Sequence, residues 1–185
     1  MGPISYIIGQ IFGIFSTIAI IIVPLYKKKW QMLVNAILIN LLMGLNYVLI
    51  GEIGSAAFLC GVAVIQCCVS MWHTLKETSP SKAETILFFL LYLGLGFFGM
   101  FTSPAFVPEL SWRNVLELFP IAGALMSMSF VFVRDEQRAR WYLLFTSLIW
   151  AVYAAAVVST TFFAELFSII SSTAAIIKYR KRAEN

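Results

Sequence analysis

The sequence predicts an all-α, polytopic membrane protein whose seven transmembrane helices form two parallel three-helix repeats joined by a linker helix. Three observations support this fold class: the hydrophobic composition, the placement of the basic residues and a weak internal repeat. Of the 185 residues, 61% are hydrophobic and 12% are charged. Soluble domains are about 45–50% apolar and about 25% charged. Because a membrane helix needs about 20 apolar residues, seven spans leave no room for a soluble domain.

Seven apolar stretches can be recognised, each bounded by charged residues, Pro, Gly or Trp. We expect helices over residues 4–25, 31–50, 55–73, 81–102, 113–133, 139–158 and 160–177. Ser81 and Glu84 have the spacing of a capping box at the start of the fourth helix. The boundary between the sixth and seventh helices is the least distinct, because little polar sequence beyond Ser159, Thr160 and Thr161 separates them.

The basic residues are distributed very unevenly between the two sides of the predicted membrane. If the N-terminus is outside, twelve Lys and Arg residues fall on one side and Arg113 alone on the other, and together they account for all 13. The crowded side receives Lys27, Lys28, Lys29, Lys76, Lys82, Arg134, Arg138, Arg140, Lys178, Arg180, Lys181 and Arg182. Basic loops stay in the cytoplasm, so we expect the N-terminus outside and the C-terminus inside.

A faint repeat relates the two halves of the chain. Aligning residues 31–47 with 137–153 pairs Gln31 with Gln137, Leu38 with Leu144, Leu42 with Leu148 and Tyr47 with Tyr153. Because one helix intervenes, both triplets have the same orientation, as in transporters built from parallel repeats. We therefore predict a first repeat over residues 1–78, a linker helix over 79–108, and a second repeat with a basic tail over 109–185.

The fourth apolar stretch differs from the other six. Tyr92 is its only polar side chain between Ile86 and Phe101, so we expect this helix to lie at the periphery. The other six stretches carry polar or small residues at helical spacing, and in lipid these faces must point inward. They predict a polar cavity along a common axis, although small and amide residues also serve as plain helix-packing surfaces.

Seven side chains are the candidate functional residues. The candidates for a substrate path are Asn40, Gln66, Trp150, Tyr153 and Ser172. Glu117 and Glu165 are embedded acids and candidates for coupling to protons or cations, because a hydrocarbon environment favours the neutral form of a carboxyl. The alternative is structural, since both acids lie near the start of their helices, where the dipole favours negative charge, and Arg113 precedes Glu117 by one turn.

Enzymatic chemistry is not expected. His73 is the only His, the only Asp is Asp135 in a loop, and no Ser–His pair lies at a common depth. Cys60, Cys67 and Cys68 share one helix and have no zinc-site spacing, so we expect no metal and no cofactor. The expected partners are the lipid bilayer and a small polar solute, with no nucleic acid; self-association is left open. The alternative to a transporter is a membrane scaffold or binding protein.

Several segments of the chain together carry a family resemblance. They are Gln31 with Asn46-Tyr47-Val48-Leu49-Ile50-Gly51, Leu116-Glu117-Leu118-Phe119-Pro120-Ile121-Ala122-Gly123, Arg138-Ala139-Arg140, Trp150-Ala151-Val152-Tyr153 and Glu165. In these segments the chain resembles the YgjV family of bacterial inner-membrane proteins. The resemblance implies a multi-pass protein of the bacterial inner membrane and carries no substrate. The three-one-three layout also resembles SWEET, PQ-loop and PnuC transporters, although the second and sixth stretches lack Pro and no Pro-Gln dipeptide occurs.

Overall fold

The computed structural model describes residues 2–23, 26, 29–104, 106–109, 111–132 and 136–183. This part of the chain contains seven α-helices and no β-strand. The helices are α1 (Pro3–Ile22), α2 (Lys29–Ile50), α3 (Ser55–Leu75), α4 (Lys82–Thr102), α5 (Trp112–Phe132), α6 (Glu136–Ala156) and α7 (Thr161–Ala183). The predicted all-α class is confirmed. Pro24 and Leu25, where the first helix was expected to end, lie outside the described residues.

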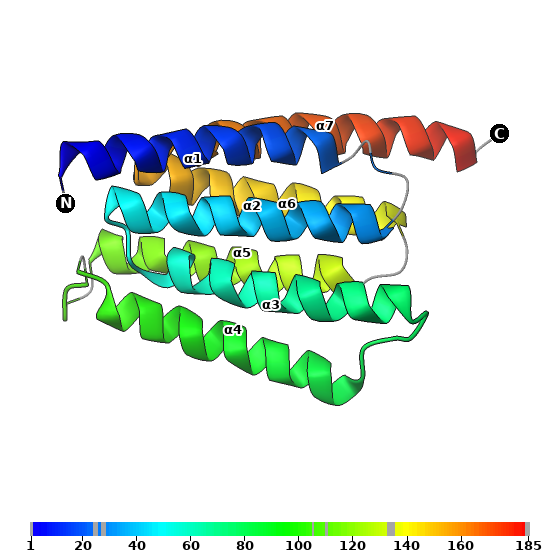
Figure 1. Ribbon diagram of the computed structural model, residues 1–185, viewed down its shortest axis with the longest axis horizontal. Helices are drawn as coiled ribbons and strands as arrows, with labels where there is room; N and C mark the ends of the chain where they lie inside the picture. The colour runs from blue at the N-terminus through cyan, green and yellow to red at the C-terminus, as the bar shows by residue number, and fades with distance from the viewer. Residues whose placement is uncertain are drawn as a thin grey trace.

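The helices lie side by side, and six of them form a closed sequence of neighbours (Figure 1). α1 packs against α2 and α2 against α3, while α5 packs against α6 and α6 against α7. The contacts of α1 with α7 and of α3 with α5 join the two groups. α4 lies outside this ring and contacts α3 and α5, so its predicted peripheral position is confirmed.

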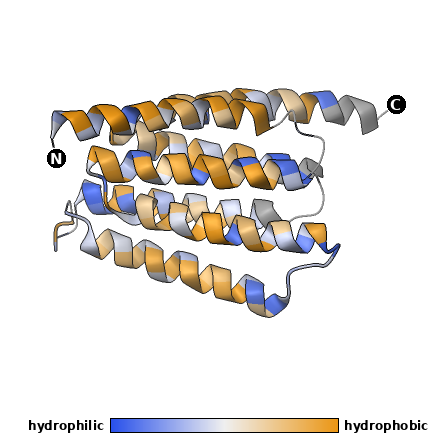
Figure 2. Cartoon of the chain, viewed as in Figure 1, coloured by the Kyte–Doolittle hydropathy of each residue, from blue (hydrophilic) through white to orange (hydrophobic). Residues whose placement is uncertain are grey.

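The outward surfaces of the helices are apolar. Figure 2 shows hydrophobic residues along the lengths of the helices, and many large ones are exposed, among them Ile18, Leu90 and Ile170. Exposed apolar surface on this scale indicates a lipid environment. Five helices are long and apolar enough to cross a membrane by length and composition: α1, α2, α3, α4 and residues 161–178 of α7. The chain is therefore an integral membrane protein.

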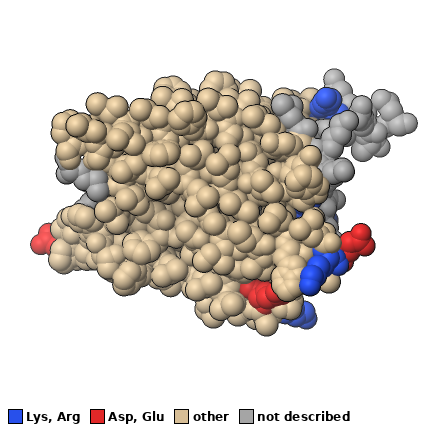
Figure 3. Space-filling model, in the orientation of Figure 1, with Lys and Arg blue, Asp and Glu red and all other residues tan. Residues whose placement is uncertain are grey.

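Charged side chains gather at the two ends of the bundle, and the visible face between them carries almost none (Figure 3). We call the end that holds the N-terminus and the α2–α3, α4–α5 and α6–α7 links the amino end, and the opposite one the carboxyl end (Figure 1). The described helix bounds put Lys29, Lys76, Lys82, Arg138, Arg140 and Lys178 at the carboxyl end. Arg113 lies at the amino end.

The predicted crowded side includes six more basic residues. Lys27, Lys28 and Arg134 lie outside the described residues. Arg180, Lys181 and Arg182 are helical, with side chains outside the described part.

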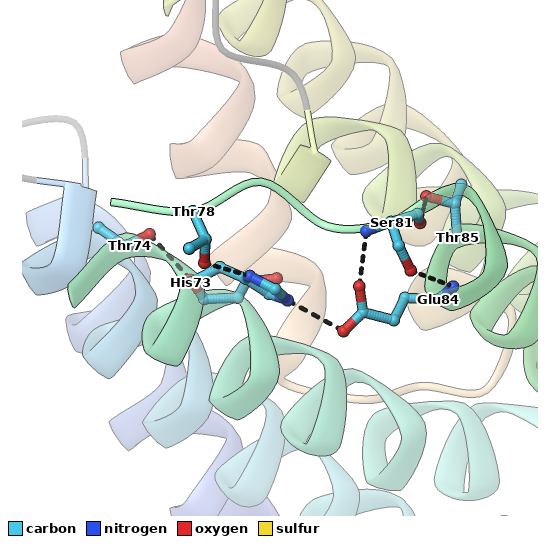
Figure 4. A network of polar contacts seen from close by, with 7 residues as sticks. His73, Thr74, Thr78, Ser81, Glu84 and Thr85 are labelled. Atoms are coloured by element: carbon cyan, nitrogen blue, oxygen red, sulfur yellow. Dashed lines mark hydrogen bonds and ion pairs between the residues drawn. The ribbon is translucent and has the colours of Figure 1, made fainter. Parts of the chain in front are cut away.

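A polar network fixes the turn between α3 and α4 (Figure 4). The capping box predicted for α4 is confirmed: Glu84 N donates to Ser81 Oγ at 3.1 Å, and Ser81 N donates to Glu84 Oε2 at 2.5 Å. His73, near the end of α3, lies 3.0 Å from Glu84 Oε1 through Nε2 and 2.7 Å from Thr78 Oγ1 through Nδ1. His73 thus joins two helices at the carboxyl end, a structural role for the only His in the sequence.

Candidate functional site

A cavity of about 120 Å³ lies between the helices. Residues from all seven helices line it, together with Val23 at the end of α1. The lining residues are Ile20, Val23, Met32, Ala36, Ile39, Asn40, Met43, Leu59, Cys60, Ala63, Gln66, Cys67, Tyr92, Ala124, Ser127, Leu143, Thr146, Ser147, Trp150, Glu165 and Ser168. Most of these side chains are apolar, and a few polar groups converge among them, which is the usual composition of a small-molecule site.

The cavity extends along the bundle towards the carboxyl end. Its lining residues closest to the amino end include Glu165 and Cys60, about 6 Å and about 8 Å from the first residues of α7 and α3 at 1.5 Å per residue. At the other extreme it includes Val23, just after α1, and Met32 in the first turn of α2. The cavity is therefore nearer to the basic, carboxyl end of the molecule.

A hydrogen-bonded pair, Gln66 on α3 and Tyr92 on α4, contributes to the lining. The Tyr92 hydroxyl, fully buried, donates to Gln66 Oε1 at 2.6 Å, and Gln66 Nε2 donates to the carbonyl oxygen of Met128 at 3.5 Å. Across the cavity, Asn40 Nδ2 donates to its own helix at Ala36 O, at 2.8 Å. The amides are thus held in fixed orientations.

Glu165 is the one carboxylate among the described residues of the lining. It is 4% exposed, and the Ser147 hydroxyl interacts with its side chain. Ser147 Oγ also donates to Ser168 Oγ at 2.7 Å, which ties α6 to α7. Thr146, on the same stretch of α6, is buried with no hydrogen-bond partner for Oγ1 among the described residues. An unpaired buried hydroxyl beside a cavity suggests a place for a ligand atom or water.

Three aromatic rings cluster near the amino end of the cavity. The ring centroids of Tyr47 and Tyr153 are 5.6 Å apart in an edge-on arrangement, and each lies 6.2 Å from that of Trp150. Both tyrosines are completely buried. Tyr47 OH is 3.2 Å from Thr161 Oγ1 in the first turn of α7. Tyr47 and Tyr153 lie about 5 Å from the ends of α2 and α6 at 1.5 Å per residue, so they occupy the amino end of the bundle next to Trp150 in the lining.

Beyond the rings, hydrogen bonds join α3 to α5. Glu117, on α5, accepts a hydrogen bond from Ser55 N at 2.9 Å through Oε2, and the Ser55 hydroxyl also donates to this atom. Ser55 Oγ is 3.0 Å from Glu117 O as well. Since Ser55 is the first residue of α3, Glu117 satisfies a free amide at that helix terminus. The ion pair of Arg113 with Glu52 supports the same junction.

The other junction, between α1 and α7, has the same pattern of bonds. Gln10 Oε1 accepts from Thr160 N at 2.9 Å, and Thr160 Oγ1 donates to Gln10 O at 3.0 Å. In addition, Asn46 Nδ2 donates to Gly9 O at 2.8 Å and Asn46 Oδ1 accepts from Ser159 Oγ at 2.7 Å. Polar bonds therefore close both junctions at the amino end.

The candidate residues from the sequence fall into two groups. Asn40, Gln66 and Trp150 line the cavity, and so does Glu165. Tyr153 packs against Trp150 outside the lining, while Ser172 is buried and its hydroxyl has no partner among the described residues. Glu117 is also outside the lining and serves as the cap described above.

Five residues of the lining that carry a hydroxyl group are not among the candidates from the sequence: Tyr92, Ser127, Thr146, Ser147 and Ser168. Thr146 and Ser168 belong to the polar stripes of their helices, so the periodicity contained a signal for them. Tyr92 is the lone polar side chain in the middle of an otherwise apolar helix, which could have pointed to an inward position.

The comparisons with known proteins decide the family. The model of the Imp-YgjV family, described as a bacterial inner membrane protein, matches residues 7–183. The chain belongs to this family. Imp-YgjV membership and the apolar spans make it a multi-pass protein of the bacterial inner membrane, as the sequence predicted. Neither the curated proteins nor the solved structures include a match.

Proposed function

We propose that this protein is a transporter or facilitator for a small solute, which binds in the cavity between the helices. One observation carries the proposal: a cavity of about 120 Å³ in the membrane-embedded bundle combines an apolar lining with Asn40, Gln66, Thr146 and Glu165. Ionisable and amide side chains are costly in a membrane interior and are found mostly where they bind or conduct a solute.

We further propose that α1–α3 and α5–α7 are two parallel repeats and that all seven helices cross the membrane. Tyr47 and Tyr153, which the sequence alignment pairs, lie against each other, as equivalent residues do beside a two-fold axis. When the alignment of residues 31–47 with 137–153 is extended in both directions, Gln10 falls within one residue of Glu117, and Ser55 falls within one residue of Thr160. These four residues make the matched bonds at the two junctions. Substrate sites at the interface between repeats are common in transporters.

The orientation that fits these features has the amino end outside and the carboxyl end in the cytoplasm. The described basic residues at helix ends lie at the carboxyl end except Arg113. By the positive-inside rule, the carboxyl end is then in the cytoplasm, and the cavity extends towards it. The aromatic cluster and the two hydrogen-bonded junctions would be the closed outer barrier of this state.

Glu165 is the residue that we propose for coupling to a proton or cation, because it faces the cavity. Tyr47 on α2 and Cys60 on α3 lie within electrostatic range of it, and Ser147 on α6 interacts with it directly. We expect Glu165→Gln to abolish any uptake driven by a pH gradient in proteoliposomes, and Glu117→Gln to retain most of it. Equal, wild-type pH dependence in both variants would remove Glu165 from the coupling step.

A cavity-filling variant tests the transport proposal. Ala124 lines the cavity from α5, whereas Ala122 on the same helix is exposed at its surface. Purified protein is screened by thermal shift against a metabolite panel, because a ligand that binds the folded state raises its stability. We expect a ligand that stabilises wild type and Ala122→Leu but not Ala124→Leu, and that crosses proteoliposome membranes only when protein is present.

A scaffold that only recruits a partner is the competing function. Such a protein needs no solute in its interior, so Ala124→Leu would leave its ligand profile unchanged. If no panel member is sensitive to Ala124→Leu and none is transported, the transporter proposal fails.

A further inference from the structure

We infer that the solute is a small organic cation, a substituted ammonium ion whose charge lies against Glu165. This inference rests on the proposed function and specifies its substrate class. It follows from the charge, the polar atoms and the size of the cavity.

The charge of the lining has one sign. Glu165 is the only acidic residue in it, and none of the described lining residues is Lys, Arg or His. Its polar neighbour Ser147 is neutral and cannot balance a carboxylate. A buried carboxylate without a counter-charge is strongly unfavourable, so a cation that lies against Glu165 favours its ionised form and gains a charged partner that a neutral or anionic solute does not.

The lining suits an organic cation better than a metal ion. Small hard cations such as Ca²⁺ and Mg²⁺ require about six or more oxygen ligands at short distances. Here most lining side chains are apolar, and the amide groups of Gln66 and Asn40 already have partners within the protein. Apolar substituents on the ammonium nitrogen match this apolar wall, and Trp150 in the lining is an aromatic residue of the kind that quaternary ammonium groups prefer.

A second observation points to a ligand at the same place. Thr146, 6% exposed, lines the cavity and its Oγ1 has no partner among the described residues. Buried hydroxyls are normally hydrogen-bonded, so this atom is available to a polar group of the solute, such as a hydroxyl or an N–H. A cation that also carries one hydrogen-bonding group would satisfy both Glu165 and Thr146.

The volume limits the size of the solute. The cavity measures about 120 Å³. An apolar protein cavity of about 150 Å³ holds benzene, which has six non-hydrogen atoms, so this cavity encloses about five. Choline is a suitable probe: its quaternary ammonium head, the nitrogen with its four attached carbons, has this size, and it carries one hydroxyl group. Its neutral analogue 3,3-dimethylbutan-1-ol has the same shape without the charge.

The test measures binding of both probes to the purified full-length protein by thermal shift and isothermal titration. We expect choline to stabilise the protein and the neutral alcohol to have no effect at equal concentration. Glu165→Gln should raise the Kd for choline about 30-fold or more, because the cation loses its buried partner. Glu165→Asp keeps the carboxylate and should restore part of the affinity, while Glu117→Gln, at the helix cap, should retain it.

The outcomes separate this inference from the proposed function. Equal binding of choline and the neutral alcohol, or choline binding unchanged in a folded Glu165→Gln protein, overturns the cation assignment. If choline fails but a neutral or anionic panel member binds wild type and not Ala124→Leu, the cation assignment falls and the transporter stands. If Ala124→Leu alters the binding of no solute at all, both fall.

Discussion

Glu117 and Gln10 act as caps for helices to which they do not belong. Each accepts a hydrogen bond from a backbone amide at the start of the helix across its junction, Ser55 N for Glu117 and Thr160 N for Gln10. Water cannot satisfy these amides inside a membrane, so a side chain has to. The neutral amide oxygen of Gln10 accepts the backbone hydrogen bond in one junction, as the carboxylate of Glu117 does in the other. The charge of Glu117 is therefore not required for capping.

Glu117→Ala should destabilise the protein, whereas Glu117→Gln should not. The alanine variant leaves Ser55 N without an acceptor, at a cost typical of lost caps, about 1–2 kcal/mol, which lowers the melting temperature by about 2–8 °C. The glutamine variant reproduces the bond that Gln10 makes. Melting followed by intrinsic fluorescence in detergent measures both, with Glu109→Gln at an exposed loop position as control. Equal losses in the alanine and glutamine variants would show that the charge itself is stabilising.

At the scale of elements, α4 depends on two glycines for its close approach to the ring. A Cβ atom at Gly96 would lie 2.8 Å from Ile121 Cγ1, and one at Gly99 would lie 2.9 Å from both Gly54 O and Ser55 Cα. The contact at Gly96 involves a side chain that can move. The contact at Gly99 involves backbone at the start of α3, which cannot move without disturbing the cap by Glu117.

Gly99→Ala is therefore expected to lower stability by about 1–3 kcal/mol, the usual cost of overpacking. Gly94, on the same helix, has no atom within 4 Å of an added Cβ and provides the matched control. Gly94→Ala should leave stability unchanged or raise it by up to about 1 kcal/mol, because Ala favours helix over Gly. Thermal melting of the two variants compares them directly, and a Gly99→Ala protein as stable as Gly94→Ala would mean that α4 can shift freely.

The helices could be predicted from the sequence because lipid imposes simple rules. Long apolar runs give their positions, and the Ser81–Glu84 spacing gives the start of α4. The positions of Asn40, Gln66, Trp150 and Ser172 along their helices predict a similar depth for all four; the first three line the cavity, whereas Ser172 is outside the lining. Glu117 could not be distinguished from Glu165 in this way. Both lie near the start of a helix, and only the packing of α3 against α5 turns Glu117 towards Ser55.

At the scale of the whole molecule, the proposed topology predicts which positions are accessible from each side. With Cys60, Cys67 and Cys68 replaced, single cysteines at Glu52 and Pro104 should react with an impermeant maleimide added to intact cells. Those at Lys82 and Arg138, at the carboxyl end, should react only after the membrane is opened; the predicted inner position Lys28 lies outside the described residues. This expectation rests on the uneven distribution of Lys and Arg between the two sides of the membrane. Labelling of Arg138→Cys from outside, with protection of Glu52→Cys, would reverse the orientation.

In the proposed orientation, the cavity is accessible from the cytoplasm and closed from the outside. Met32 lines the cavity at the carboxyl end, and in the proposed state Tyr47, Tyr153 and the two hydrogen-bonded junctions form a closed barrier at the amino end. A cysteine at Met32 should therefore react with a small impermeant thiol reagent in inside-out vesicles and stay protected in right-side-out vesicles.

Leu38→Cys, on an exposed face of the same helix, is the control for reagent that partitions into lipid. A bound solute should slow the reaction at Met32→Cys and not at Leu38→Cys, because only the former lies on the path to the cavity. Equal rates from both sides at Met32→Cys would show that the amino end is not a barrier, and the proposed closed outer side would have to be given up.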